Sequence, residues 1–309
     1  MYRANFLLLC RAAWEGLCMS QGSSPAGICS DATGVGYKKC LEWQRSDLIS
    51  RHQPIPDAKS ADQRSFEARI AHEIATLLCD MQLDGAVMGV DVAIPSPHGL
   101  ELQLHPLMAK RVLAVLQGKE APESGRLGVP GLRPKWIGKT LVLRDSFSDA
   151  CVHVTGLPRQ ARFWTEHQGK VSKDETRMRS DWASAVRGER VDSREWILSR
   201  LLRRPKLLRA IGGHYGQVNS YSHGWEDLIL EWCCGPEPKD IVRQFDRSGL
   251  SFYPIEPLYE FSRWFPDGTP DEIRLADSQL IFRRYHRKKC PADPARSSRV
   301  RELLIEDYR

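Results

Sequence analysis

Three carboxylates and one amide between positions 67 and 103 have the types needed for metal-dependent cleavage of a phosphodiester. Asp91 lies in a run of β-branched residues, and Glu101 and Gln103 lie on one face of an alternating segment. An Asp and a Glu on adjacent strands can hold one Mg²⁺ ion, which would activate a water molecule. Glu67, on a preceding helical segment, completes the candidate set. An amphipathic hairpin with its polar face in solvent is an equally simple interpretation.

The order of these elements is a helix followed by two strands, which carry Asp91 and then Glu101-x-Gln103. This order resembles the core of the restriction-endonuclease-like nucleases. The resemblance covers residues 60–118 and implies a Mg²⁺-dependent nuclease. Two positions depart from that family's pattern, because Val90 stands where the family has Pro and Gln103 stands where it has Lys.

A second candidate group is a basic segment that ends in a predicted helix. Between Arg177 and Arg209 there are ten Lys or Arg residues and four carboxylates, an excess equal to the net charge of +6 of the whole chain. Such a local charge, with Trp182 and Trp196 nearby, suits phosphate contacts and base stacking. The alternative is a solvated helix face whose Arg stems cover apolar surface. The candidate phosphate-binding residues are Arg194, Arg200, Arg203, Arg204, Lys206 and Arg209.

A glycine-rich turn follows this helix, with the sequence Ile-Gly-Gly-His-Tyr-Gly-Gln-Val over residues 211–218. Glycines let the backbone approach a ligand closely, and N–H groups in such turns can bind phosphate. The turn resembles the glycine-rich loop of the RAMP proteins, which are ferredoxin-like RNA-binding subunits of CRISPR effector complexes. One departure is the short stretch between the glycines, which here is only His214. The resemblance implies contacts to the guide RNA backbone from Gly212, Gly213, Tyr215 and Gly216.

Some members of that superfamily cleave RNA without a metal by using a His to activate the 2′-hydroxyl group. The resemblance therefore makes His214 and His223 candidates for RNA cleavage. A His in a glycine turn is also an ordinary turn residue, so we assign no catalytic residue.

A second basic cluster follows an alternating segment late in the chain. Its cations either bind phosphates at the end of a strand or deter aggregation along a solvated edge strand. They are Arg283, Arg284, Arg287, Lys288 and Lys289.

The hydrophobic pattern predicts an α+β fold with antiparallel sheets, packed helices and units that could be ferredoxin-like. Ser60 and Gln63 predict a capping box at the start of the clearest helix. Pro205 is expected to break a later helix. Helices are predicted over 60–81, 107–117, 192–209 and 240–245 and from 296 onward. Strands are predicted over 86–94, 100–105, 139–145, 151–155, 217–221, 228–232 and 272–285.

The chain of 309 residues is long enough for two domains. Residues 119–135 are rich in Gly and Pro, so we expect a linker there between an N-terminal domain (1–118) and a basic C-terminal domain (136–309). No internal repeat is evident in the sequence.

Composition excludes two broad classes. Hydrophobic residues are 41% and charged residues 27% of the chain, which is ordinary globular usage rather than that of a disordered protein. No apolar run reaches the ~18 residues of a membrane-spanning helix. The apolar stretch at residues 6–10 is shorter than a signal peptide needs, so we expect a cytoplasmic protein without a membrane partner. The nine cysteines include no closely spaced pair of the kind that binds zinc.

The two basic clusters together favour a nucleic-acid-binding protein, with RNA preferred over DNA. The expected role is that of a subunit in a ribonucleoprotein complex of the CRISPR effector type, with other protein subunits as partners, in antiviral defence. No cofactor is expected for this role. The alternatives are a Mg²⁺-dependent nuclease and a protein-interaction module. The question of enzymatic activity stays open, with a binding role favoured.

Overall fold

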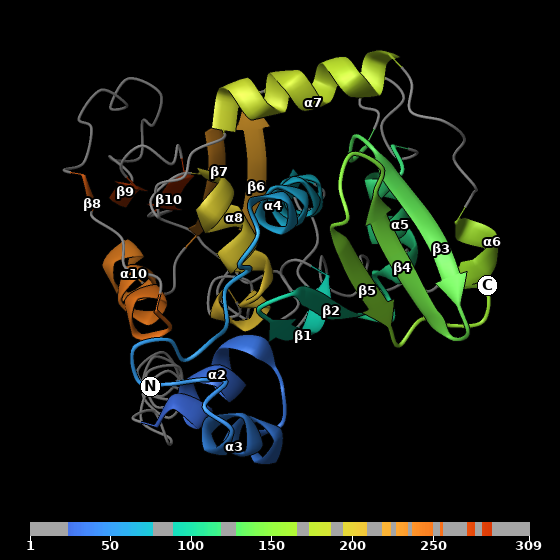
Figure 1. Ribbon diagram of the computed structural model, residues 1–309. Coiled ribbons are helices and arrows are strands. Elements are labelled where there is room, and N and C mark those ends of the chain that lie inside the picture. Colours follow the sequence, from blue (N-terminus) through green and yellow to red (C-terminus); the bar gives the residue numbers. More distant parts are fainter. Residues whose placement is uncertain are drawn as a thin grey trace, which may run out of the picture.

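A computed structural model shows an α+β protein, as predicted, in which helices pack on two mixed β-sheets (Figure 1). No helix among the residues that it describes is long and apolar enough to cross a membrane. The structure describes residues 24–76, 89–118, 128–165, 173–186, 194–208, 218–223, 227–233, 237–249, 254–255, 271–275 and 280–285.

The first sheet has five strands in the order β1-β2-β5-β4-β3. β2 and β5 are parallel neighbours and the other pairs are antiparallel. The predicted hairpin at 86–105 and the predicted strand pair at 139–155 are both present. The strands are β1 (Val90–Ser96), β2 (Gly99–Leu104), β3 (Leu132–Ile137), β4 (Thr140–Asp145) and β5 (Cys151–Thr155).

The linker expected at 119–135 is wrong as a boundary between domains. β3 begins at Leu132, inside that range, and β2 from the expected N-terminal domain pairs with β5 from the expected C-terminal one. Gly128, Pro130 and Gly131, which the structure describes, instead form the entry to β3. Gly128 and Gly131 have φ of 70° and 79°, and the Pro130 carbonyl accepts a hydrogen bond from Arg69 Nη1.

The second sheet repeats the connectivity of the first. Its order is β6-β7-β10-β9-β8, again with one parallel pair, β7 with β10, in the same place. The strands are β6 (Val218–His223), β7 (Asp227–Cys233), β8 (Pro254–Ile255), β9 (Asp271–Leu275) and β10 (Leu280–Tyr285).

The helices repeat in the same places. α4 (Ala61–Thr76) precedes the first sheet and α8 (Arg194–Leu202) precedes the second, while α5 (Ala109–Leu116) and α10 (Pro238–Arg247) follow the second strand of each sheet. The chain therefore contains one α-β-β-α-β-β-β arrangement twice. A repeat that is not evident in the sequence is thus present in the order of the helices and strands. This order differs from the β-α-β-β-α-β order of a ferredoxin-like unit.

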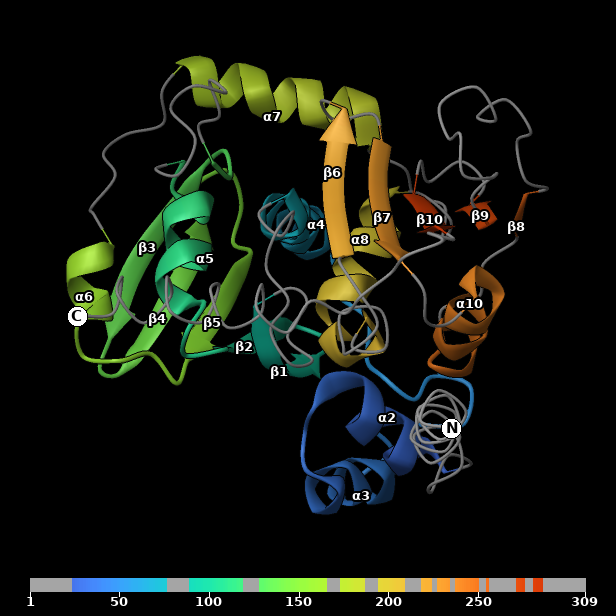
Figure 2. The same cartoon turned by 180° about the vertical axis from the view of Figure 1, so that it is seen from behind.

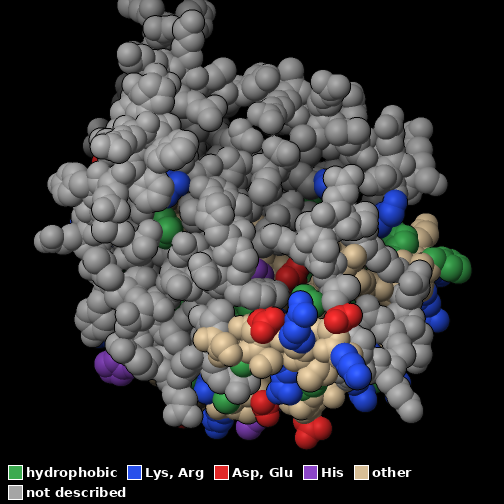
Figure 3. All heavy atoms as spheres, turned by 90° about the horizontal axis from the view of Figure 1, so that it is seen from above, with side chains coloured by type: hydrophobic (Ala, Val, Ile, Leu, Met, Phe, Trp, Pro, Cys, Tyr) green, Lys and Arg blue, Asp and Glu red, His purple; other side chains and the backbone are tan. Residues whose placement is uncertain are grey.

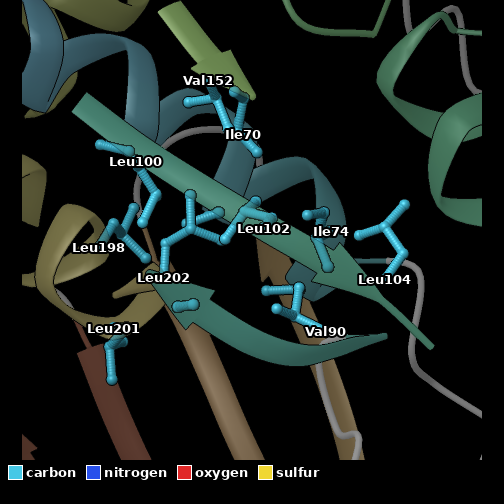
Figure 4. Close-up of a cluster of buried hydrophobic side chains, with 14 of the residues drawn as sticks. Ile70, Ile74, Val90, Leu100, Leu102, Leu104, Val152, Leu198, Leu201 and Leu202 are labelled. Carbon is cyan, nitrogen blue, oxygen red and sulfur yellow. The ribbon is translucent and has the colours of Figure 1, made fainter. Parts of the chain in front are cut away.

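α4 and α8 pack against each other between the two sheets and supply the core. Ile70 and Ile74 of α4 meet Leu102 of β2, and Leu198 of α8 joins the same cluster (Figure 4). The predicted start of α4 is half confirmed. Ser60 Oγ accepts from the Gln63 N–H at 3.0 Å, but the Gln63 amide side chain bonds to the Cys151 backbone in β5. The capping residue thus also fixes α4 on the sheet.

The remaining helices lie around this core. α8 ends at Leu202 and a short 3-10 helix, η2 (Pro205–Leu208), follows, which confirms the break predicted at Pro205. α7 (Lys173–Val186) runs across the top in Figures 1 and 2, within a polar stretch. Seen from above in Figure 3, Lys and Arg side chains lie beside Asp and Glu over α7, so the described part of this face carries mixed charge. The others are α2 (Pro25–Thr33), α3 (Tyr37–Arg45) and α6 (Ala161–Trp164).

Candidate nucleic-acid interface

The residues of the predicted metal site are not brought together. Glu67 is completely buried, and its carboxylate accepts hydrogen bonds from Arg203 Nε at 2.8 Å and Nη2 at 2.6 Å. Ser199 Oγ also donates to it, at 2.7 Å. A carboxylate whose oxygens are taken up by a buried guanidinium has no place for a metal ion.

The other three members of the set lie apart from Glu67. Asp91 falls at a β-bulge in β1, with a carboxylate oxygen 3.8 Å from Lys206 Nζ. Glu101 and Gln103 share a face of β2, as predicted, and Glu101 accepts a hydrogen bond from Thr155 Oγ1 at 2.9 Å. Within the described residues, no three His, Cys, Asp or Glu side chains form a group that could hold a metal ion.

The arginines predicted to bind phosphate at the end of α8 point inward. Arg203 is completely buried and, besides Glu67, donates to the carbonyls of Pro56 at 2.7 Å and Ser96 at 2.8 Å. Arg204 is 1% exposed and donates to the Ser248 carbonyl and to Asp57. The prediction that these two side chains bind nucleic acid is therefore wrong, because their N–H groups are used inside the protein.

Arg204 shows the electrostatic cost of this position. Burial lowers the pKa of its guanidinium to about 10, and the nearby Asp57 carboxylate offsets only part of that effect. Arg200 donates to the same carboxylate at 2.6 Å, and Lys206 lies beside Asp91. The cations from Arg200 to Lys206 are thus paired with carboxylates from the N-terminal third of the chain.

The second predicted cluster is internal where the structure describes it. Arg283 is 3% exposed, and Arg284 Nη2 lies 3.9 Å from a Glu237 carboxylate oxygen. His223 ends β6 and Arg194 begins α8. The other predicted residues lie outside the described part of the chain: Arg209, Gly212, Gly213, His214, Tyr215, Gly216, Arg287, Lys288 and Lys289.

The turn between β3 and β4 and the helix α6 adjoin each other (Figure 1). Both carry exposed Lys and Arg residues, a basic surface that the sequence did not single out. Its cations are exposed, and none forms an ion pair with any residue that the structure describes. Between residues 132 and 165 there are only two carboxylates: Asp145, the last residue of β4 at the end away from this turn, and Asp149, which follows it. We call this surface the tip patch; it consists of Lys135, Ile137, Lys139, Arg159, Arg162 and Phe163.

Two side-chain contacts join α6 to the β3–β4 turn. Arg162 Nη2 donates to the Gly138 carbonyl at 2.6 Å, and its guanidinium lies 5.3 Å from the centre of the Trp136 ring. Trp136 Nε1 in turn donates to Thr165 Oγ1 at 2.8 Å. The two chain segments that carry the tip patch are therefore held in a fixed relation.

The face of the first sheet beside the tip patch carries no described helix, since α4 and α5 cover the opposite face (Figures 1 and 2). Arg144 and His153 are exposed on this uncovered face, next to Cys151. Burial raises the pKa of the Cys151 thiol, and the Arg144 charge opposes this only partly. A thiol with a raised pKa is a poor nucleophile at neutral pH, which argues against cysteine catalysis here.

Comparison with protein-family models, curated proteins and solved structures finds no match to the chain. The tip patch is therefore interpreted from its own charge, exposure and rigidity.

Proposed function

We propose that the chain binds nucleic acid, RNA in preference to DNA, through the tip patch, as a subunit of a ribonucleoprotein complex. The observation that carries the proposal is the group of four exposed cations that form no ion pair with a carboxylate in the described part of the chain. Exposed cations in most proteins are interspersed with anions, as over α7 in Figure 3. A surface of one sign attracts a polyanion and gains free energy from the counterions that the polyanion releases.

The choice of RNA and of a multi-subunit complex rests on the glycine turn. η2 ends at Leu208 and β6 begins at Val218, so the turn joins a helix to a strand, as it does in the RAMP proteins that it resembles. This order supports a place in a complex of the CRISPR effector type. The connectivity of the two sheets departs from that family's ferredoxin-like order. The glycine turn, and not the sheet topology, therefore supports the proposed role in such a complex.

The decisive test removes charge from the tip patch and compares the loss with an equal loss elsewhere. The patch variant is Lys135→Ser/Lys139→Ser/Arg159→Ser. The control is Lys39→Ser/Lys239→Ser/Arg243→Ser, which removes the same charge from exposed residues that each lie beside a carboxylate. Binding of a labelled RNA oligonucleotide is measured by fluorescence anisotropy over a range of salt concentrations.

The patch variant should bind at least about tenfold more weakly at low salt. The slope of log K against log salt concentration should fall by about 2, because each phosphate contact to a single strand contributes about 0.7. The control variant should bind nearly as tightly as the wild type. Equal losses in the two variants, or no binding by the wild type at low salt, would refute the proposal and favour the protein-interaction alternative.

A further inference from the structure

Phe163 is far more exposed than any other large hydrophobic side chain that the structure describes. It is 87% exposed, whereas Ile137, the next in order and also in the tip patch, is 51% exposed. Exposed apolar residues are common when they stand singly. Here the two most exposed ones lie within one patch of cations, which calls for a common explanation.

The exposure of Phe163 is imposed by its neighbours on either side. Ala161 is completely buried and Trp164 packs against the core, so the backbone of α6 is anchored. Arg162 is held by the Gly138 carbonyl. A fixed helix consequently presents the Phe163 ring to solvent. The backbone that carries the ring therefore loses little conformational entropy on binding.

An exposed aromatic ring among cations matches a ligand that has both an aromatic face and negative charge. An unpaired base with its phosphates has both, and bases of every kind can stack on an aromatic side chain. In a duplex the faces of the bases are already stacked on one another, so a duplex could offer only phosphates to the tip patch. An apolar protein partner would cover Phe163 but would leave the cations of the patch unmatched.

We propose that the ligand of the tip patch is single-stranded nucleic acid and that one unpaired base stacks on Phe163. The inference rests on the proposed function and specifies its ligand. Neighbouring phosphates of the strand contact Lys139 and Arg159, and Ile137 supports the edge of the stacked base. The chain thus binds single strands without reading a particular base, because stacking tolerates any base.

Phe163→Ser is the variant that tests the stacked base, and Phe163→Tyr is its conservative partner. Tyr37→Ser on α3 is the matched control, because Tyr37 is another exposed aromatic residue, at 41% exposure, outside the tip patch. Three ligands are compared: a single-stranded uridine oligonucleotide, an RNA duplex of the same length, and an abasic strand that keeps the phosphates and lacks bases. Thermal melting of each variant confirms that the fold is intact.

Phe163→Ser should weaken binding of the uridine strand by about fivefold to a hundredfold, without changing the salt slope. Phe163→Tyr should restore binding, and Tyr37→Ser should have no effect. The abasic strand should bind the wild type about as weakly as the uridine strand binds Phe163→Ser.

Two outcomes would overturn the inference and leave the proposed function intact. In the first, wild type and Phe163→Ser bind the uridine strand equally, which would show that phosphates alone are recognised. In the second, the wild type prefers the duplex, which would show that the phosphates of paired strands, and not an unpaired base, are what the tip patch recognises. If the wild type binds none of the three ligands at low salt, the proposed function fails as well.

Discussion

Replacing Arg203 with Met should destabilise the protein more than any change at the surface. The variant leaves the Glu67 carboxylate in the core without its cation, and Met lacks the donors that bond to the Pro56 and Ser96 carbonyls. Breaking a buried ion pair by removing one partner typically costs about 3–5 kcal/mol. We expect a loss of this size, since Ser199 and Gln63 still donate to the carboxylate and limit the damage.

A double-mutant cycle isolates the interaction free energy between Glu67 and Arg203 from the effects of their other neighbours. Glu67→Gln removes the buried negative charge and keeps the shape of the side chain. In the Arg203→Met background this change should restore part of the lost stability, because no unpaired charge remains. The coupling free energy between the two positions should be about 2–3 kcal/mol, at the upper end of the range for contacting residues.

Urea denaturation followed by circular dichroism measures these differences, and Arg243→Met provides the control. Arg243 has a side chain that is 70% exposed, and among the described residues its ion-pair partner is Asp240 on its own helix. Its replacement should cost less than about 0.5 kcal/mol.

Equal losses of stability in Arg203→Met and Arg243→Met would refute a stabilising role for the buried ion pair. A folded Arg203→Met protein with weaker RNA binding and a smaller salt slope would show that Arg203 contacts phosphate, as the sequence first indicated.

Three further predictions concern the backbone, a helix cap and a thiol. Gly128→Ala should destabilise the protein more than Gly138→Ala in thermal melting, by about 1–3 kcal/mol from overpacking. Both glycines have positive φ, so that penalty cancels. Only a Cβ at Gly128 would overlap backbone, at 2.5 Å from a carbonyl oxygen. Ser60→Ala should cost about 1 kcal/mol by loss of the N-cap bond of α4. Cys151 should react with a thiol reagent more slowly than an unhindered cysteine at pH 8, because its raised pKa leaves less thiolate. Arg144→Ala should slow that reaction further, as peptide mass spectrometry would measure.

Local pattern predicted several helices and strands, but it missed β3 and did not show how the elements assemble. Strict alternation placed β2, and the capping Ser60 placed the start of α4 correctly. The Gly and Pro content of 119–135 was misinterpreted as a linker because composition does not show that Gly131 turns the chain into β3. The pairing of β2 with β5 joins residues about 50 positions apart, for which no local pattern exists.

The error over the arginines has the same physical origin. A charge excess measured within residues 177–209 ignores carboxylates elsewhere in the chain, and Glu67 lies 136 positions before Arg203. The tip patch escaped notice for the opposite reason. Its cations lie in two short segments that look unremarkable separately, and they become one surface only through the bond from Arg162 to Gly138. The scarcity of carboxylates between 132 and 165 was the one signal available in the sequence.

The doubled connectivity of the chain changes how the α4–α8 contact should be understood. A contact between two identical subunits has to be complementary to itself, because each residue on one side recurs on the other. When the two repeated units lie in one polypeptide, their contact need not be self-complementary. A residue on one side of the contact can then differ from its counterpart on the other side. The ion pair from Glu67 on α4 to Arg203, directly after α8, uses that freedom by placing the carboxylate in one copy and the guanidinium in the other. What the two halves of the chain share is therefore the order of their helices and strands, while the residues at their contact differ from one half to the other.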